Sequence, residues 1–373
     1  MPGVLSRFQA SHTCLLVGLM AVAGCLLPLT PARAAKPDEA AVQTAPTPQP
    51  AARRVVPTSP TLPPPQVAAP LNAAEAAKAQ AERLKRIGLV KSWGYQLVGV
   101  SVEEAVLAPF DLLVVDATGG HASDRHFQRE EVERLKRKPD GSRRLVLSYL
   151  SIGEAEDYRQ DYFTAEYMTE DPPEWLGTEN AQWKANRIVN FCHEGWQKTV
   201  LGDDKGRSYY NSIDPAPVQR LLELGFDGVY LDRVDVYAEV KKECPGSDKK
   251  MVEFVARIAA QARKTEPGFL VVMQNGEELL RHKALVDAID AVAKEDLFYG
   301  IDHGQAANPK GAVDAAVRNL KLAKDAGRAV LVVDYVLEAS KKADAKRRSL
   351  EHGFVPYIGP RDLGRLWLPG RDF

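Results

Sequence analysis

The chain has 373 residues, of which 45% are hydrophobic and 27% are charged, and its formal net charge is -1. This length suits one large globular domain or two smaller ones, and the hydrophobic content is ordinary for a globular protein. The balanced charge provides no excess of basic side chains for a polyanion, so we expect no nucleic acid among the partners.

The first 34 residues have the layout of a secretory signal peptide. Arg7 precedes an apolar run, Cys14–Leu29, and Ala32-Arg33-Ala34 offers a small-x-small cleavage site. The run is short for a membrane span and is broken by Pro28, so we expect no transmembrane span in the mature chain. This interpretation predicts a secreted or periplasmic protein.

A second interpretation of the same segment is a lipid anchor. Val22-Ala23-Gly24-Cys25 resembles a bacterial lipoprotein processing site, which would make Cys25 the lipidated first residue of a membrane-anchored lipoprotein. The apolar Leu26–Leu29 that follows speaks against it. Cleavage after Ala34 is therefore the first expectation, and the lipid anchor is the alternative.

Residues 35–85 are predicted to be a Pro/Ala-rich linker and a lead-in helix. Lys36–Pro70 is rich in Pro, Ala, Thr and Gln, has almost no large apolar side chains and cannot bury a core. Asn72–Ile87 is dense in Ala, Glu, Lys and Arg, which favours a helix. The sequence leaves open whether this helix is still part of the linker. We expect the folded domain over residues 86–373.

From Trp93 onward, short apolar runs alternate with helix-like segments. The predicted strands are Trp93–Val98, Leu112–Val115, Arg144–Leu150, Arg187–Asn190, Gly228–Leu231, Phe269–Met273, Ala291–Lys294 and Ala329–Val333. The predicted helices between and after them include Phe127–Lys138, Met251–Thr265, Ala312–Asp325 and Ser340–His352. Alternating strands and helices favour βα units with a parallel sheet, and eight strands fit an α/β fold of the (β/α)8 TIM-barrel type.

Two points of this fold prediction stay open. Phe354–Ile358 is a ninth candidate strand, so the count of strands is uncertain by one. A doubly wound sheet is the alternative architecture, and it is disfavoured because no Gly-x-Gly-x-x-Gly follows a strand.

Two cysteines, Cys192 and Cys244, remain after removal of the signal peptide. In an exported protein they could form one disulfide, or they could be free buried thiols. The chain has no Cys-x-x-Cys and no Cys/His cluster, which disfavours a structural zinc site. We expect neither a metal nor a cofactor.

Acidic side chains recur at the carboxyl ends of the predicted strands. In Gly225–Tyr237 the apolar Val229–Leu231 is followed by Asp232 and Asp235. Barrels of this class place their chemistry at that end of the strands, whereas the simpler interpretation is an aspartate that caps the next helix. The recurrence favours chemistry. The acids at strand ends are Asp116, Glu154, Glu156, Asp232, Asp235, Glu277, Glu295 and Asp334, and the nearest basic residues are Arg159 and Arg233.

Paired carboxylates across a sugar-sized gap are the usual machinery of glycoside hydrolysis. Aromatic residues between the third and fourth predicted strands suit stacking on sugar rings, although any single tryptophan is more often part of a core. These residues are Tyr158, Tyr162, Phe163, Trp175 and Trp183. Clustered acids could instead hold Mg²⁺ or Ca²⁺ in a metal-assisted hydrolase or deacetylase. No nucleophile-elbow motif for Ser/His/Asp catalysis is present.

Several ordered segments resemble the signature segments of glycoside hydrolase family 114. They are Ser148–Arg159, Gly225–Asp235, Gln274-Asn275-Gly276-Glu277 and Ala293-Lys294-Glu295-Asp296. The resemblance spans about Trp93 to Tyr357. Within the family, the chain most resembles the branch of bacterial and archaeal hydrolases. It implies a TIM barrel, endo-α-1,4-polygalactosaminidase activity and a polysaccharide substrate.

The resemblance also implies roles for individual residues. The catalytic carboxylates would be Asp232, as the nucleophile of a retaining mechanism, and Glu295, as the general acid/base, on the fifth and seventh predicted strands. Glu154 is the reserve candidate for a catalytic role. The substrate-binding residues would be Asp116, Tyr149, Glu154, Glu156, Asp235, Asn275, Glu277, Asp334 and Tyr335. The sequence leaves open whether the mechanism is retaining or inverting.

The sign of the charge around these residues bears on the substrate. An acidic cleft would concentrate a cationic amino-sugar polymer and repel uronic-acid polymers. Because a fold does not fix a function, a catalytically silent barrel that binds polysaccharide at the cell envelope remains an alternative.

Overall fold

The structure, a computed structural model, describes residues 72–118, 126–156, 159, 172–208 and 214–373. The predicted signal peptide, Cys25 and most of the predicted linker lie outside the described residues. The central element is an eight-stranded sheet in which every neighbouring pair of strands is parallel. In sheet order the strands are β1 (Trp93–Gln96), β2 (Leu112–Asp116), β3 (Leu145–Ser151), β7 (Gly228–Asp232), β8 (Leu270–Gln274), β9 (Ala291–Glu295), β10 (Ala329–Asp334) and β11 (Val355–Ile358). The predicted α/β barrel is confirmed, and the doubly wound alternative is wrong.

The barrel closes between β11 and β1 through side chains rather than through a strand ladder. The indole N–H of Trp93 donates to the carbonyl of Val355 at 3.0 Å, and the rings of Trp93 and Tyr357 lie 5.6 Å apart. Tyr95 and Tyr230 continue this aromatic cluster with ring centroids 5.2 Å apart, and all four side chains are buried. The barrel is therefore filled by packed rings, which form the floor beneath the carboxyl ends of the strands.

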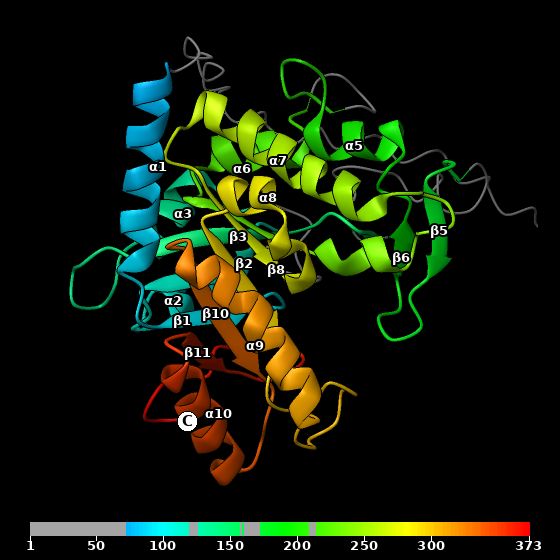
Figure 1. Ribbon diagram of the computed structural model, residues 1–373. Coiled ribbons are helices and arrows are strands. Elements are labelled where there is room, and N and C mark those ends of the chain that lie inside the picture. Colours follow the sequence, from blue (N-terminus) through cyan, green and yellow to red (C-terminus); the bar gives the residue numbers. More distant parts are fainter. Residues whose placement is uncertain (1–71, 119–125, 157–158, 160–171, 209–213) are drawn as a thin grey trace, which may run out of the picture. The chain divides into compact units, whose positions relative to one another are not determined.

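Helices cover the outside of the barrel (Figure 1). They are α2 (Val102–Ala105), α3 (Arg129–Leu135), α6 (Pro217–Leu224), α7 (Ser247–Thr265), α8 (Lys283–Ala288), α9 (Lys310–Asp325) and α10 (Ala339–Glu351). After α6, α9 and α10 the chain turns into the next strand through Gly225, Gly327 and Gly353, whose φ angles are 80°, 78° and 68°. Glycine adopts this left-handed conformation without steric cost. Of the helices in the described part of the chain, none combines the length and apolar character needed to cross a lipid bilayer.

Helix α1 (Ala73–Gly88) is fixed to the amino ends of the barrel strands. It begins with a capping box formed by Asn72 and Glu75. Arg83 donates to Asp290 at 3.0 Å, and Arg86 donates to Asp227 at 2.9 Å. These two aspartates directly precede β9 and β7 and also accept backbone N–H groups of neighbouring strands. The helix that the sequence left unassigned therefore packs on the barrel.

A three-stranded antiparallel sheet is inserted between β3 and β7. It consists of β4 (Glu154–Glu156), β5 (Leu176–Glu179) and β6 (Asn186–Val189) in the order β4-β6-β5. The prediction that Arg187–Asn190 is the fourth barrel strand is wrong, because this segment lies in β6 of the inserted sheet. The ninth candidate, Phe354–Ile358, supplies the eighth barrel strand, β11. Asp232 and Glu295 consequently lie on the fourth and sixth barrel strands, not on the fifth and seventh.

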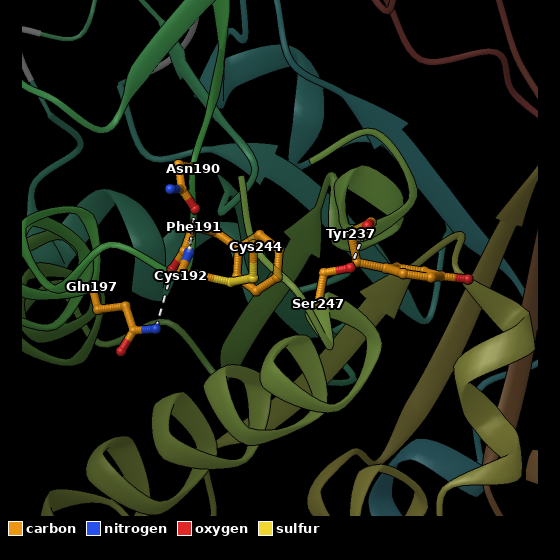
Figure 2. Close-up of a disulfide and its surroundings, with 7 residues drawn as sticks. All are labelled: Asn190, Phe191, Cys192, Gln197, Tyr237, Cys244 and Ser247. Carbon is orange, nitrogen blue, oxygen red and sulfur yellow. Dashed lines mark hydrogen bonds between the residues drawn. A yellow bond between two sulfur atoms is a disulfide. The ribbon is translucent and has the colours of Figure 1, made fainter. Parts of the chain in front are cut away.

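A disulfide links the inserted segment to the loop after β7. Cys192 follows β6 and precedes α5 (Glu194–Leu201), and Cys244 lies between the short helix η1 (Val234–Ala238) and α7. The two residues are 52 positions apart in sequence, and their Cα atoms lie 6.1 Å apart (Figure 2). On the Cys244 side, Ser247 Oγ donates to the carbonyl of Tyr237 at 2.7 Å. Of the two alternatives left open by the sequence, the structure has the bonded pair.

Candidate active site

Three neighbouring barrel strands end in the same way. Each of β7, β8 and β9 ends at a polar residue, and the next residue has a left-handed backbone. The strand-end residues are Asp232, Gln274 and Glu295, and their successors are Arg233 (φ 58°), Asn275 (φ 56°) and Asp296 (φ 50°). Such a conformation costs a residue with a Cβ on the order of 1–3 kcal/mol and persists only where the surroundings impose it. The repeated turn ends each strand sharply and leaves its last side chain at the rim of the barrel.

A cavity of about 400 Å³ opens at this rim. Its lining includes most of the predicted site residues, namely Asp116, Tyr149, Glu154, Glu156, Asp232, Asp235, Asn275 and Glu295. Carboxylates outnumber Lys and Arg side chains in the lining, so the cavity is acidic. Within the described residues, no group of three or more His, Cys, Asp and Glu side chains is placed to hold a metal ion.

Asp232 and Glu295 are joined by a single amide group. Gln274 Nε2 donates to Asp232 Oδ1 at 2.8 Å and to Glu295 Oε2 at 2.7 Å. Because both oxygens lie within hydrogen-bond distance of one nitrogen, they are separated by at most about 5.5 Å, the sum of the two bonds. Gln274 was not predicted as a site residue, although its position at the end of β8 was a signal that could have identified it.

Neutral donors complete the surroundings of the two carboxylates. The hydroxyl of Tyr149 donates to Asp232 Oδ2 at 2.8 Å, and the hydroxyl of Tyr335 donates to Glu295 Oε1. Asn275 Nδ2 donates to Glu295 Oε2 at 3.3 Å. These bonds fix the direction of each carboxylate without supplying a positive charge, and tyrosine and amide donors remain in place over a wide pH range.

Burial and mutual repulsion raise the pKa of both carboxyls. The pKa of Asp232 is raised to about 7, first by burial and then by the charges of Glu295 and Asp235. Burial also raises the pKa of Glu295; the hydrogen bond from Tyr335 opposes this shift, and the charge of Asp296 reinforces it. Two coupled carboxyls that repel each other favour the state in which one holds a proton and the other is ionised. This division suits a proton donor beside an anionic nucleophile.

Most of the other acids of the cavity differ because they have basic partners. Arg159 pairs with Asp116 and Glu156, and Arg233 pairs with Glu154 at 2.7 Å and Asp235 at 3.4 Å. Further ion pairs join Lys294 to Glu277 at 3.2 Å and Arg361 to Asp296 at 2.7 Å. Lys294 and Arg361 were missed among the basic residues of the site. Arg361 follows β11 and lies far from Asp296 in sequence.

Glu154 has the contacts of a structural anchor. Its carboxylate accepts hydrogen bonds from Asn180 Nδ2 at 2.7 Å and from Asn186 Nδ2 at 3.1 Å, in addition to the ion pair with Arg233. The residue is buried. With both oxygens engaged by the inserted sheet and the β7 loop, it is poorly placed to exchange a proton with a substrate.

Three predicted site residues do not line the cavity. Tyr335 lies behind Glu295 and contacts it, and Glu277 is held by Lys294. Asp334 Oδ1 accepts the backbone N–H groups of Phe298 and Tyr299 at 2.9 and 3.1 Å. Successive side chains of an extended chain face opposite sides. Asp334, the last residue of β10, therefore turns away from the barrel interior, whereas Tyr335, the next residue, faces it.

Of the aromatic residues predicted to stack on sugar rings, one lines the cavity and one is part of the core. Trp183 lines the cavity, whereas Trp175 is buried against Trp196 with ring centroids 4.9 Å apart. Tyr158, Tyr162 and Phe163 lie outside the described residues.

Comparison with known proteins identifies the family. The model of glycoside-hydrolase family GH114 matches residues 71–369. Protein MJ1477 of Methanocaldococcus jannaschii is 33% identical over 295 residues, which cover 74% of this chain and 79% of that protein.

Two solved structures share the fold. The glycoside hydrolase domain of PelA from Pseudomonas aeruginosa has 20% identity and a TM-score of 0.55, with 74% of this chain and 97% of that chain covered. Aspergillus fumigatus Ega3 in complex with galactosamine has 15% identity and a TM-score of 0.51, with 74% and 94% covered. At these identities the likeness concerns the fold alone. On the family match and the 33% identity together, the chain belongs to glycoside-hydrolase family GH114, a family of glycosidases that act on polysaccharides.

Proposed function

We propose that the chain is an exported, endo-acting glycosidase that cleaves an α-1,4-linked galactosamine-type polysaccharide with retention of anomeric configuration. The observation that carries the proposal is the pair Asp232 and Glu295, held by the one amide nitrogen of Gln274. Retaining enzymes place their two carboxyls roughly 5–5.5 Å apart, whereas inverting enzymes leave about 6.5–9.5 Å for a water molecule. A separation of at most about 5.5 Å supports retention.

In the first step of this mechanism, ionised Asp232 attacks the anomeric carbon and the glycosidic bond breaks. Protonated Glu295 gives its proton to the departing oxygen, and a covalent glycosyl ester forms on Asp232. In the second step Glu295, now ionised, takes a proton from water, whose oxygen attacks the same carbon and releases the carboxylate. Tyr149 and Gln274 orient the nucleophile, and Tyr335 orients the acid/base.

The charge of the cavity supports an amino-sugar polymer as substrate. Galactosamine units without acetyl groups carry ammonium groups, which the excess of carboxylates would attract. The similar fold of Ega3, solved with galactosamine, is consistent with this class of sugar. Because the attraction is electrostatic, binding of such a polymer should weaken as salt is added.

The test compares product release from partially deacetylated galactosaminoglycan and from a neutral polymer. Wild type should cleave the cationic polymer, Asp232→Asn and Glu295→Gln should lose turnover, and the first products should keep their anomeric configuration by NMR. Asp334→Asn is the matched control, because Asp334 faces away from the cavity and should be dispensable for turnover. Binding without turnover by wild type would favour the silent barrel, and turnover abolished by a chelator would favour the metal-assisted hydrolase.

Export is a separate part of the proposal. The layout of the first 34 residues supports it, and the disulfide is consistent with an oxidising compartment. Mass spectrometry of the mature protein tests it. A chain that starts after Ala34 supports secretion or a periplasmic location, and a chain that starts at a lipid-modified Cys25 supports the lipoprotein alternative.

A further inference from the structure

The tip of the β5–β6 hairpin is a rigid turn at the edge of the cavity. Asn180 Oδ1 accepts the backbone N–H groups of Gln182 and Trp183 at 2.9 and 3.3 Å, and its own N–H donates to the carbonyl of Asn186 at 2.7 Å. Ala185 has a left-handed backbone with φ 72°, and its N–H donates to Glu179 Oε1 at 3.1 Å. Several bonds thus hold a conformation that a residue with a Cβ rarely adopts.

Trp183 is the exposed residue of this turn. It lines the cavity with Gln182 and Lys184, and 48% of its surface is exposed. The other tryptophans of the chain are almost completely buried, with exposed fractions from 0 to 7%. Trp183 therefore contributes little to the core, and the rigid turn keeps a large apolar ring in contact with water at the cavity wall.

The turn is connected to the catalytic strand through one buried carboxylate. Glu154 accepts from Asn180 and Asn186 at the two ends of the turn and pairs with Arg233, the residue after Asp232. The position of Trp183 is thereby set relative to the proposed nucleophile. Figure 1 shows that β5 and β6 lie at the side of the molecule opposite to α1, which is fixed to the amino ends of the strands.

We propose that Trp183 is a stacking platform for a pyranose ring of the bound glycan, at a subsite beside the one where the bond is cleaved. An aromatic ring packs against the C–H face of a sugar, and an ammonium group on that sugar would add a cation–π attraction. Glu154 is the positioning residue of this subsite. The inference rests on the proposed glycosidase function, since it assigns a subsite to the same cavity.

Kinetics on partially deacetylated galactosaminoglycan test the proposal. Trp183→Ala should raise KM about 10- to 30-fold, the loss expected when an aromatic side chain that the bound ligand covers is removed, and should change kcat much less. Trp183→Phe should restore most of the affinity because it keeps an aromatic face. Leu89→Ala is the matched control, because Leu89 is also a large exposed apolar residue (68%) but does not line the cavity.

Glu154→Gln tests the positioning role. It should raise KM as Trp183→Ala does and shift the fluorescence emission of Trp183 in the substrate-free protein, while Trp183→Ala combined with Glu154→Gln should add little to either single change. A rise in KM without the emission shift, or full additivity of the two changes, would overturn the positioning role.

Binding measured in the Asp232→Asn background separates this inference from the proposed function. If wild type cleaves the polymer and Trp183→Ala leaves KM unchanged, the subsite is refuted and the glycosidase proposal stands. If no variant cleaves the polymer but its binding still depends on Trp183, the subsite stands and the glycosidase proposal fails. A folded protein that does not bind the polymer at all would overturn the subsite.

Discussion

Replacement of Asp232 by Asn should make the folded protein more stable at neutral pH, although it removes the proposed nucleophile. The pKa of Asp232 is raised to about 7 in the folded state, from an ordinary value near 3.8. Its contribution to stability is therefore complete below about pH 4 and is lost as pH rises through about 7. Since a tenfold change in an equilibrium corresponds to about 1.4 kcal/mol, the rise of the pKa from 3.8 to about 7 costs at most about 4 kcal/mol at pH 8.

Asparagine removes this cost and keeps the hydrogen bonds of the site. Its Oδ1 can accept from Gln274 Nε2, and its Nδ2 can donate to the hydroxyl oxygen of Tyr149, which then acts as acceptor. The variant therefore keeps a partner on each side of residue 232, and the Tyr149 hydroxyl proton is free to turn toward the cavity that Tyr149 lines. Urea unfolding of both proteins from pH 4 to 9 gives the difference in unfolding free energy, which should be near zero at pH 4 and should favour the variant by up to about 4 kcal/mol at pH 8.

Asp116 is the control with the opposite sign. It is also buried, but the charge and hydrogen bonds of Arg159 and the bonds from Thr118 outweigh burial and lower its pKa. Asp116→Asn should thus destabilise the protein at neutral pH by about 3–5 kcal/mol, because a buried guanidinium loses a partner, and this penalty should shrink as pH falls. If Asp232→Asn were no more stable than wild type at pH 8, or if both variants shifted stability in the same direction, the electrostatic description of the site would be refuted.

Two further predictions concern the hydrogen bond to the proposed nucleophile and the disulfide. Tyr149→Phe removes a charge-assisted bond of about 1.5–3 kcal/mol, so the acid limb of the pH–rate profile, set by Asp232, should move up by about one to two pH units. The control is Tyr230→Phe, because the Tyr230 hydroxyl has no hydrogen-bond partner in the described residues, and this variant should leave the acid limb in place. An equal shift of the acid limb in the two variants would contradict its assignment to Asp232. Cys192→Ser combined with Cys244→Ser should lower the unfolding free energy by about 4 kcal/mol, as expected for a cross-link that spans 52 residues. The reduced wild type should then unfold at the same denaturant concentration as the double variant. If the double variant were as stable as the oxidised wild type, the result would argue against the cross-link.

Several barrel strands were predictable because they carry two signals. A glycine such as Gly225 ends the preceding helix, and a short apolar run then ends at a polar residue such as Asp232. The segment Arg187–Asn190 carries the same kind of run but belongs to the inserted sheet. Four residues cannot specify which strand they pair with, so the error in strand count could not be avoided from periodicity alone.

The site was predictable in its acids and less so in their partners. Asp232 and Glu295 stand at strand ends, which the sequence reveals, whereas the ion pair of Asp296 with Arg361 depends on how distant segments meet. One placement could have been foreseen. Asp334 is the last residue of β10 and Tyr335 follows it directly, so the two adjacent side chains point to opposite sides.

The anchoring of α1 has a consequence for how the enzyme would meet a polymer. Arg83 and Arg86 fasten this helix where the strands begin, and the cavity opens where they end. If the protein is attached through the residues that precede Asn72, α1 links that attachment to the amino ends of the strands, and the cavity lies at their opposite ends. A long glycan could then bind in the cavity at an internal bond without passing the point at which the protein is attached.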